Sequence, residues 1–301
     1  MKVPVSRWAV LVQMCLCMLA SVVAFQGIPP VLSLILREFH LSHHQGGMLM
    51  SMFALPAIIL SLPTGLLVDR YGTKPVAAAA LLLAAAGSVA VACANSYPAL
   101  IIGRMITGVG AIMLLVVTPQ GVGAAFASGE MGLAMGVFNV SGPMAILVSF
   151  IGLPALATRF GWRSSVWVTT AYYSAVLILL LSFYRVPNTR PSLSGGGGRL
   201  GRMWPGRGSL TLWLVGLSWA FFNGSVVALF SFCPDFLVNR GFTLESAGFY
   251  TSIVVITSLV FAPVSGFLTD RVRRKEMLIV LGGVCTALCQ LFSPPYTAAL
   301  V

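Results

Sequence analysis

Long apolar runs alternate along this chain with short segments that hold most of its charged residues. A helix needs about 20 mainly apolar residues to cross the hydrocarbon core of a bilayer. Each run of that length therefore predicts one membrane-spanning helix. The predicted helices cover about residues 8–30, 46–68, 75–94, 99–120, 132–155, 164–184, 209–232, 246–268 and 277–292. This pattern predicts an all-α, polytopic membrane protein.

One segment breaks the alternation. Between Arg185 and Gly208 the chain holds prolines, four consecutive glycines and five arginines, with no apolar period. Such a composition is typical of a flexible, solvated linker. We therefore predict three parts: a six-helix N-terminal bundle over 1–184, a cytoplasmic linker over 185–208, and a partial C-terminal bundle over 209–301 that holds helices 7–9 and the start of a tenth.

Composition excludes a soluble globule. The chain is 58% hydrophobic and 8% charged, whereas soluble domains contain about 25% charged residues. Its net charge of +11 does not indicate nucleic-acid binding, because cytoplasmic loops of membrane proteins collect Lys and Arg. With the N-terminus inside, thirteen basic residues fall on the inner side and four on the outer side. We therefore expect a bacterial inner-membrane protein with a cytoplasmic N-terminus.

The chain shows no pattern of an enzyme or a metal protein. No Cys or His spacing suits zinc, and no segment resembles a nucleophilic, phosphate-binding or redox site. We predict no catalytic residue, no metal and no cofactor. His40, His43 and His44 fall in the predicted outer loop between the first two helices. They are interpreted as solvated loop residues or, alternatively, as a sensor of pH or metal.

A charged motif lies between helices 2 and 3 and returns in a related form after helix 8. The first copy contains Gly65, Asp69, Arg70, Gly72 and Lys74, and the second contains Gly266, Asp270 and Arg271. Similar motifs at matching places in two sets of helices indicate a parallel internal repeat, which is typical of transporters.

The first copy resembles the loop 2–3 signature of the major facilitator superfamily, and the second resembles its weaker copy in loop 8–9. Arg104, Gly108 and Gly110 are similar to that family's helix 4 motif, and Gly161-Trp162-Arg163 before helix 6 is also familiar there. The resemblance implies the family's two-bundle fold and secondary transport by alternating access. It also implies that the hinge motif forms a latch between the two halves on the cytoplasmic side.

The chain departs from the family pattern in three respects, one of which is Thr107, at a position where the helix 4 motif often carries a longer polar residue. The family usually has twelve helices, and helix 11, which packs near the first hinge, is not among the nine predicted here. The antiporter motif of helix 5 is incomplete, because Phe138 and Ile146 stand where glycines are expected around Gly142-Pro143. We therefore do not infer antiport.

Polar residues within the predicted spans are the candidates for contact with a solute. Arg104 is the only charged residue well inside a span, and a charge at such depth indicates a functional site. It would attract an anionic solute, organise Gln26 on helix 1, or serve only as a structural arginine bonded to helix 1 carbonyls. Asn139 and Asn223 lie near mid-membrane and are further candidates for contact with the solute. Alternatively, each forms hydrogen bonds that hold helices together. The aromatic residues Phe25, Trp219 and Phe222 would line a cavity or pack between helices.

These observations favour secondary transport of a small solute by alternating access. The first half loosely resembles cyanate, nitroimidazole and nitrate-type porters, which together with Arg104 favours a small anionic or polar solute. The expected partners are that solute and the lipid bilayer, with no nucleic acid and an oligomeric state left open. Since the chain stops at Val301 after a Pro-Pro turn, the alternative is a shortened, non-transporting product of the family or a membrane partner or sensor.

Overall fold

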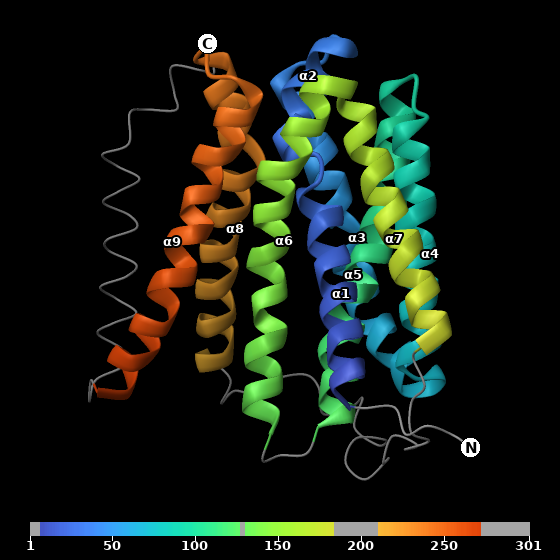
Figure 1. Ribbon diagram of the computed structural model, residues 1–301, viewed down its shortest axis with the longest axis vertical. Helices are drawn as coiled ribbons and strands as arrows, with labels where there is room; N and C mark the ends of the chain where they lie inside the picture. The colour runs from blue at the N-terminus through green and yellow to red at the C-terminus, as the bar shows by residue number, and fades with distance from the viewer. Residues whose placement is uncertain (1–6, 127–129, 184–209, 272–301) are drawn as a thin grey trace. The chain divides into compact units, whose positions relative to one another are not determined.

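The computed structural model describes residues 7–126, 130–183 and 210–271, and these residues form helices joined by short turns, without a strand among them. Figure 1 shows the helices within residues 1–253 running side by side. Their bounds are α1 Arg7–Gln26, the 3-10 helix η1 Pro29–Val31, α2 Leu32–Glu38, α3 His43–Tyr71, α4 Thr73–Ala92, α5 Tyr97–Ala125, α6 Met131–Phe160, α7 Trp162–Phe183, α8 Leu210–Asn239 and α9 Leu244–Arg271. The predicted all-α fold is confirmed.

Within the described residues, seven stretches are long and apolar enough to cross a membrane. The first, Arg7–Glu38, joins α1, η1 and α2, and the others match the next six predicted spans. The predicted eighth span corresponds to α9. The predicted linker and ninth helix lie outside the described residues.

The chain separates into two compact units, residues 1–253 and 254–301. The contacts described below all lie within the first unit. The expected division into a six-helix bundle, a linker and a partial second bundle remains a prediction.

Helix α1 ends at Gln26, a few residues before the predicted end of the first span at residue 30. The prolines Pro29 and Pro30 do not start a polar loop, however, because they begin η1, which leads into α2, and α2 ends at Glu38. Proline lacks only a donor that the first turn of a helix does not use, so a pair of prolines can begin a new helix. The apolar residues that follow, including Leu32, Ile35 and Leu36, are buried, and their burial favours a helix in place of the expected polar loop.

The charged hinge is shorter than predicted. Helix α3 includes Gly65, Asp69 and Arg70 and ends at Tyr71, and α4 starts at Thr73, so that Gly72 alone forms the turn. Its φ of +83° lies in a region that glycine adopts without the steric cost of a Cβ atom. A similar turn at Gly161, with φ +81°, joins α6 to α7, where the predicted helices left a longer connection over residues 156–163.

The glycines of the family's helix 4 motif, Gly108 and Gly110, lie on α5 in this structure and allow close helix packing. A Cβ atom added to Gly108 would lie 2.1 Å from the backbone oxygen of Phe53 in α3, and one added to Gly110 would lie 2.4 Å from the backbone oxygen of Ala80 in α4. Real Cβ atoms do not approach so closely. Small residues are frequent at such membrane-helix interfaces because they let two backbones meet. The two glycines therefore hold α5 against α3 and α4.

The Trp162–Arg163 pair at the start of α7 ties together three elements at the end of the bundle that carries α2. The Trp162 indole Nε1 donates to Glu38 Oε2 at 2.6 Å, and Arg163 forms an ion pair with the same carboxylate. Arg163 also donates through its second terminal nitrogen to the carbonyl oxygen of Ala94, at 3.0 Å. One arginine thus satisfies a carboxylate of α2 and a backbone oxygen just beyond the end of α4.

We expect Arg163→Ala to lower the free energy of unfolding by about 1–2 kcal/mol, since it removes a partly exposed ion pair and leaves the Ala94 carbonyl without its donor. The measurement is the thermal midpoint of the purified protein. Arg159→Ala is the matched control, because Arg159 is exposed at the end of the neighbouring helix α6. Equal midpoints for the two variants would contradict the assigned role.

Candidate functional site

The larger cavity lies between α1 and α3 on one side and α8 on the other, with a volume of about 440 Å³. This volume lies within the range of small-molecule sites. Its wall includes Phe25 of α1, Met50 and Ser51 of α3, and Gly224, Ser231 and Phe232 of α8. Helix α1 is the first helix of the predicted N-terminal half, and α8 is the first helix of the predicted C-terminal half. The cavity therefore lies between the two predicted halves, where solute sites of transporters built from repeats are found.

The wall of this cavity is mainly apolar. The hydroxyl groups of Ser51 and Ser231 interrupt the apolar surface, and the Ser51 hydroxyl donates to the Gly47 carbonyl of its own helix at 3.0 Å. Among the described residues that line the cavity, none carries a charge. This surface can hold a small solute through apolar contact and a few hydrogen bonds.

Arg104 is buried on α5, at 2% exposure. One terminal nitrogen of its guanidinium donates to the Ala24 carbonyl of α1 at 2.9 Å, and the guanidinium carbon lies 4.3 Å from the centroid of the Phe53 ring. A cation over an aromatic face is stabilised by the ring quadrupole. These contacts match the alternative of a structural arginine bonded to helix 1 carbonyls.

A smaller cavity adjoins Arg104. Its volume is about 20 Å³, and its wall includes Gly27, Thr107, Thr169 and Tyr173. A space of this size holds about one water molecule. A solute as large as nitrate therefore has no room beside Arg104 in this conformation.

The other polar candidates do not line the larger cavity. Gln26 is buried at 4%, and its side-chain oxygen has no hydrogen-bond partner among the described residues. Asn139 is exposed on α6, and Asn223 is half-buried on α8, next in sequence to the cavity residue Gly224. A role in solute contact for these residues and for Arg104 stays a prediction.

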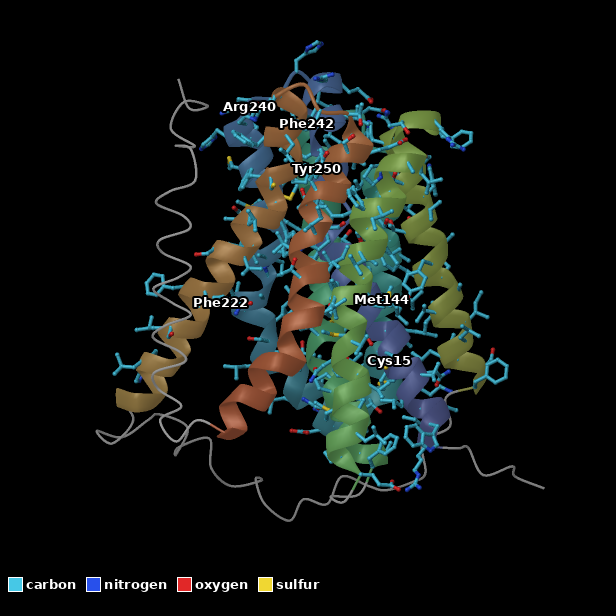
Figure 2. All side chains as sticks on the ribbon, turned by 60° about the vertical axis from the view of Figure 1, so that its left-hand side comes forward. Cys15, Met144, Phe222, Arg240, Phe242 and Tyr250 are labelled. Atoms are coloured by element: carbon cyan, nitrogen blue, oxygen red, sulfur yellow. The ribbon has the colours of Figure 1, made fainter. Side chains whose placement is uncertain are left out.

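The three aromatic candidates differ in position. Phe25 lines the larger cavity, whereas Phe222 is 58% exposed and projects outward from α8 in Figure 2. The side chain of Trp219 lies outside the described residues. Phe25 also packs against Phe53, with ring centroids 5.3 Å apart. Two aromatic rings therefore connect the cavity wall with Arg104.

The small residues of the cavity wall were not predicted from the sequence. Gly47, Ser51 and Ala54 recur on α3 at spacings of four and three, and α8 carries the same pattern in Gly224, Ala228 and Ser231. Residues three and four apart share one face of a helix. The signal was present in the sequence, but a small-residue face indicates close packing as readily as a cavity.

The residues of the first hinge motif lie at the end of α3, in the Gly72 turn and at the start of α4. The Lys74 side chain donates to the Leu181 carbonyl near the end of α7 at 3.0 Å, a favourable place for a cation because of the helix dipole. Arg70 lies over the ring of its neighbour Tyr71, and Asp69 is exposed. A Cβ atom added to Gly65 would meet no described atom within 4 Å.

The second copy of the motif, Gly266, Asp270 and Arg271, lies in the last part of α9. The predicted second-copy loop was therefore also wrong up to Arg271, where the described residues end. For both copies, a latch between the two halves stays a prediction.

A family model described as Major Facilitator Superfamily matches residues 14–301. The "Probable nitrate/nitrite antiporter NarK1" of Thermus thermophilus is 27% identical over 258 residues, which are 82% of this chain and 58% of that protein. The "Nitrite extrusion protein" of Bacillus subtilis is 24% identical over 89% of this chain and 67% of its own length. The chain thus spans about 58% of the first of these relatives.

Solved structures show the same fold. A bacterial homolog of the human lysosomal transporter Spinster, in an inward-facing and unoccupied conformation, matches with a TM-score of 0.74 at 19% identity. The match covers 90% of this chain and 64% of that one. The nucleoside transporter NupG matches with a TM-score of 0.67 at 14% identity, over 87% of this chain and 68% of that one.

Proposed function

Because this chain belongs to the Major Facilitator Superfamily and is an integral membrane protein, we propose that it is a secondary transporter that moves a small solute by alternating access. The observation that carries the proposal is the cavity of about 440 Å³ between α1, α3 and α8. In transporters built from repeats, the solute binds between the two halves, and the halves rock about that site.

A small anion is the first candidate for the solute. Relatives of this chain are described as nitrate or nitrite transporters, and Arg104 is a buried cation in the first unit. The rings of Phe25 and Phe53 connect Arg104 with the cavity wall. Under this proposal Arg104 acts on the solute through its field and through the position of the two rings.

A small uncharged solute is the second candidate. The specific observation that favours it is the lining of the cavity, where the described residues offer apolar surface and two serine hydroxyls. An anion in such surroundings loses hydration without gaining a direct ionic partner, which is costly. Transport of an anion changes the membrane potential unless another charge accompanies it, so the two candidates differ in their response to an imposed potential.

We propose that the protein lies in a bacterial inner membrane with a cytoplasmic N-terminus. The charge distribution along the chain supports this orientation. It places the hinge turn at Gly72 on the cytoplasmic side and α2, at the other end of Arg7–Glu38, on the outer side. In the proposal Gly65, Asp69, Arg70, Gly72 and Lys74, together with the second copy, act as the inner latch.

Saturable uptake of nitrate into vesicles that contain the purified chain is the expected result, and Ser231→Phe should reduce it by about tenfold or more because the ring fills the cavity. Ser225→Phe is the matched control. It makes the same change on the same helix, but Ser225 is exposed and is not a lining residue. Equal loss of uptake in both variants would contradict the cavity as the path of the solute, and non-saturating flux would favour a passive channel.

A further inference from the structure

The smaller cavity, of about 20 Å³, lies beside Arg104 among the helices α1, α4, α5 and α7. These helices pack on one another within the first unit, and Figure 1 shows them next to each other. The cavity shares no lining residue with the larger one. The polar residues of its wall are Ser88 of α4, Arg104 and Thr107 of α5, and Thr169 and Tyr173 of α7.

Arg104 carries a buried positive charge that no described carboxylate neutralises. The ion pairs among the described residues are Arg7–Glu130, His43–Asp235 and Arg163–Glu38. The Ala24 carbonyl that accepts from Arg104 lies in the last turn of α1, where the helix dipole supplies only a partial negative charge. A net positive charge therefore remains within this group of helices.

Arg104 also has a donor that is not used. Its Nε atom is buried and has no hydrogen-bond partner among the described residues. A buried donor without an acceptor is costly, and more so when it belongs to a charged group. Since Arg104 lines the smaller cavity, a ligand held there can serve as the missing acceptor.

Hydroxyl groups of the same wall can donate to such a ligand. Ser88 accepts a hydrogen bond from Thr170 at 2.7 Å, but the acceptors for its own hydrogen, the Val166 carbonyl and the Thr169 hydroxyl, are both 3.4 Å away. Strong O–H···O bonds are about 2.5–3.0 Å long, so the Ser88 hydrogen can turn into the cavity. Tyr173 also lines the cavity, and its phenolic O–H is a further donor.

The two threonine hydroxyls of the wall suit a different ligand. Thr107 donates to the Gly103 carbonyl at 2.8 Å, and Thr169 donates to the Val166 carbonyl at 2.8 Å. Their oxygens can therefore only accept, which suits a water molecule. The charge decides between the two ligands, because water would leave the charge of Arg104 in place. The cost of burying Arg104 is incurred with either ligand, so an anion adds only the loss of its own hydration.

We propose that the smaller cavity binds a monatomic anion, with chloride as the first candidate. The ion neutralises Arg104 and accepts hydrogen bonds from its Nε atom and from Ser88. A space for about one water molecule is close in size to a halide ion and is too small for a polyatomic anion such as nitrate. The ion is a resident of the first unit and not the transported solute, so the inference goes beyond the proposed function.

The resident ion changes how Arg104 acts on the solute. A neutralised guanidinium exerts a weaker field at the larger cavity. Its contacts with the Ala24 carbonyl and the Phe53 ring do not depend on its field at a distance. Of the two actions proposed above for Arg104, the position of the two rings is then the one that persists.

The test is the thermal midpoint of the purified full chain in detergent, measured at constant ionic strength while sodium chloride replaces sodium gluconate. An ion that binds the folded protein alone raises the midpoint. We expect a saturable rise of about 2–5 °C when chloride reaches about ten times its dissociation constant. The Ser231→Phe variant, in which the larger cavity is filled, should show the same rise with chloride and no saturable rise with nitrate.

Two further variants and a control locate the ion. Arg104→Gln keeps a side chain that can donate but removes the charge, so it should abolish the rise. Ser88→Ala removes one donor and should weaken the apparent affinity for chloride about tenfold or more, the effect of one hydrogen bond to a charged group. Ser165→Ala makes the same change at another buried serine of the first unit, which does not line the cavity, and should keep the unmodified affinity.

The outcomes separate the anion site from its alternatives. No saturable rise with chloride, or an equal rise with nitrate in Ser231→Phe, overturns the proposal and leaves the cavity to a water molecule. A full response in Arg104→Gln also overturns it. If Arg104→Gln does not fold, the comparison of serine variants decides, and equal chloride affinities in Ser88→Ala and Ser165→Ala overturn the proposal.

The measurement also separates this site from the transport function, because it needs neither a solute nor a vesicle. A chloride response without saturable uptake of any tested solute would reject the proposed function alone. Saturable uptake without a chloride response would reject the anion site alone.

Discussion

Gly108→Ala is expected to destabilise the protein severely, because the added Cβ atom would lie 2.1 Å from the backbone oxygen of Phe53. A backbone oxygen within a helix cannot move to another rotamer, so α3 and α5 would have to separate. Inserting a methyl group into a packed interior costs about 1–3 kcal/mol when side chains can adjust, and a clash with backbone belongs at or above the upper end. The same shift would disturb the Phe53 ring beneath Arg104.

The matched control is Gly123→Ala on the same helix. Gly123 is exposed, and an added Cβ would meet no described atom within 4 Å. Since alanine favours a helix over glycine by about 1 kcal/mol, this variant should keep or raise the thermal midpoint of the purified protein. The two substitutions thus have opposite expected signs. Equal midpoints for Gly108→Ala and Gly123→Ala would show that the close approach of α5 to α3 is not needed for stability.

Among the described residues, the helical type and the approximate positions of the spans could be predicted because the bilayer leaves few options. Backbone polar groups within hydrocarbon must be satisfied internally, so an apolar run of sufficient length becomes a helix. Helix ends are less constrained. The sequence placed Asp69 and Asp235 outside helices because they are charged, but at a membrane surface a helix can continue through charged residues until a glycine such as Gly72 ends it.

The candidate site was harder to predict than the fold. Charge inside a span is rare, and this rarity directed attention to Arg104, which the structure places against Ala24 and Phe53. Asn139 was chosen for its depth in the span, but depth does not tell which way a residue faces, and the side chain is exposed. The larger cavity depends on which faces of α1, α3 and α8 meet. That arrangement is tertiary and has no distinctive signature in single residues.

Arg104→Ala should reduce solute uptake by about tenfold or more, as expected for a buried charge within a transporter span. The substitution leaves the Ala24 carbonyl without its donor and removes the cation from the face of Phe53. Phe53 packs against Phe25, which lines the cavity, so the loss reaches the cavity wall. Arg159→Ala, at an exposed arginine, should leave uptake within about twofold, as for most surface substitutions.

Arg104→Lys separates the two functional roles of this arginine. Lysine keeps the charge but lacks the planar guanidinium that stacks on a ring and donates in a fixed direction. If Arg104 acts through its charge, uptake of an anion by Arg104→Lys should remain well above that of Arg104→Ala. If it acts by positioning α1 and Phe53, both variants should lose maximal uptake and thermal stability together, for charged and uncharged solutes alike. Uptake and stability unchanged in Arg104→Ala would exclude both roles, because neither the field of the cation nor its bond to α1 would then matter to the cavity.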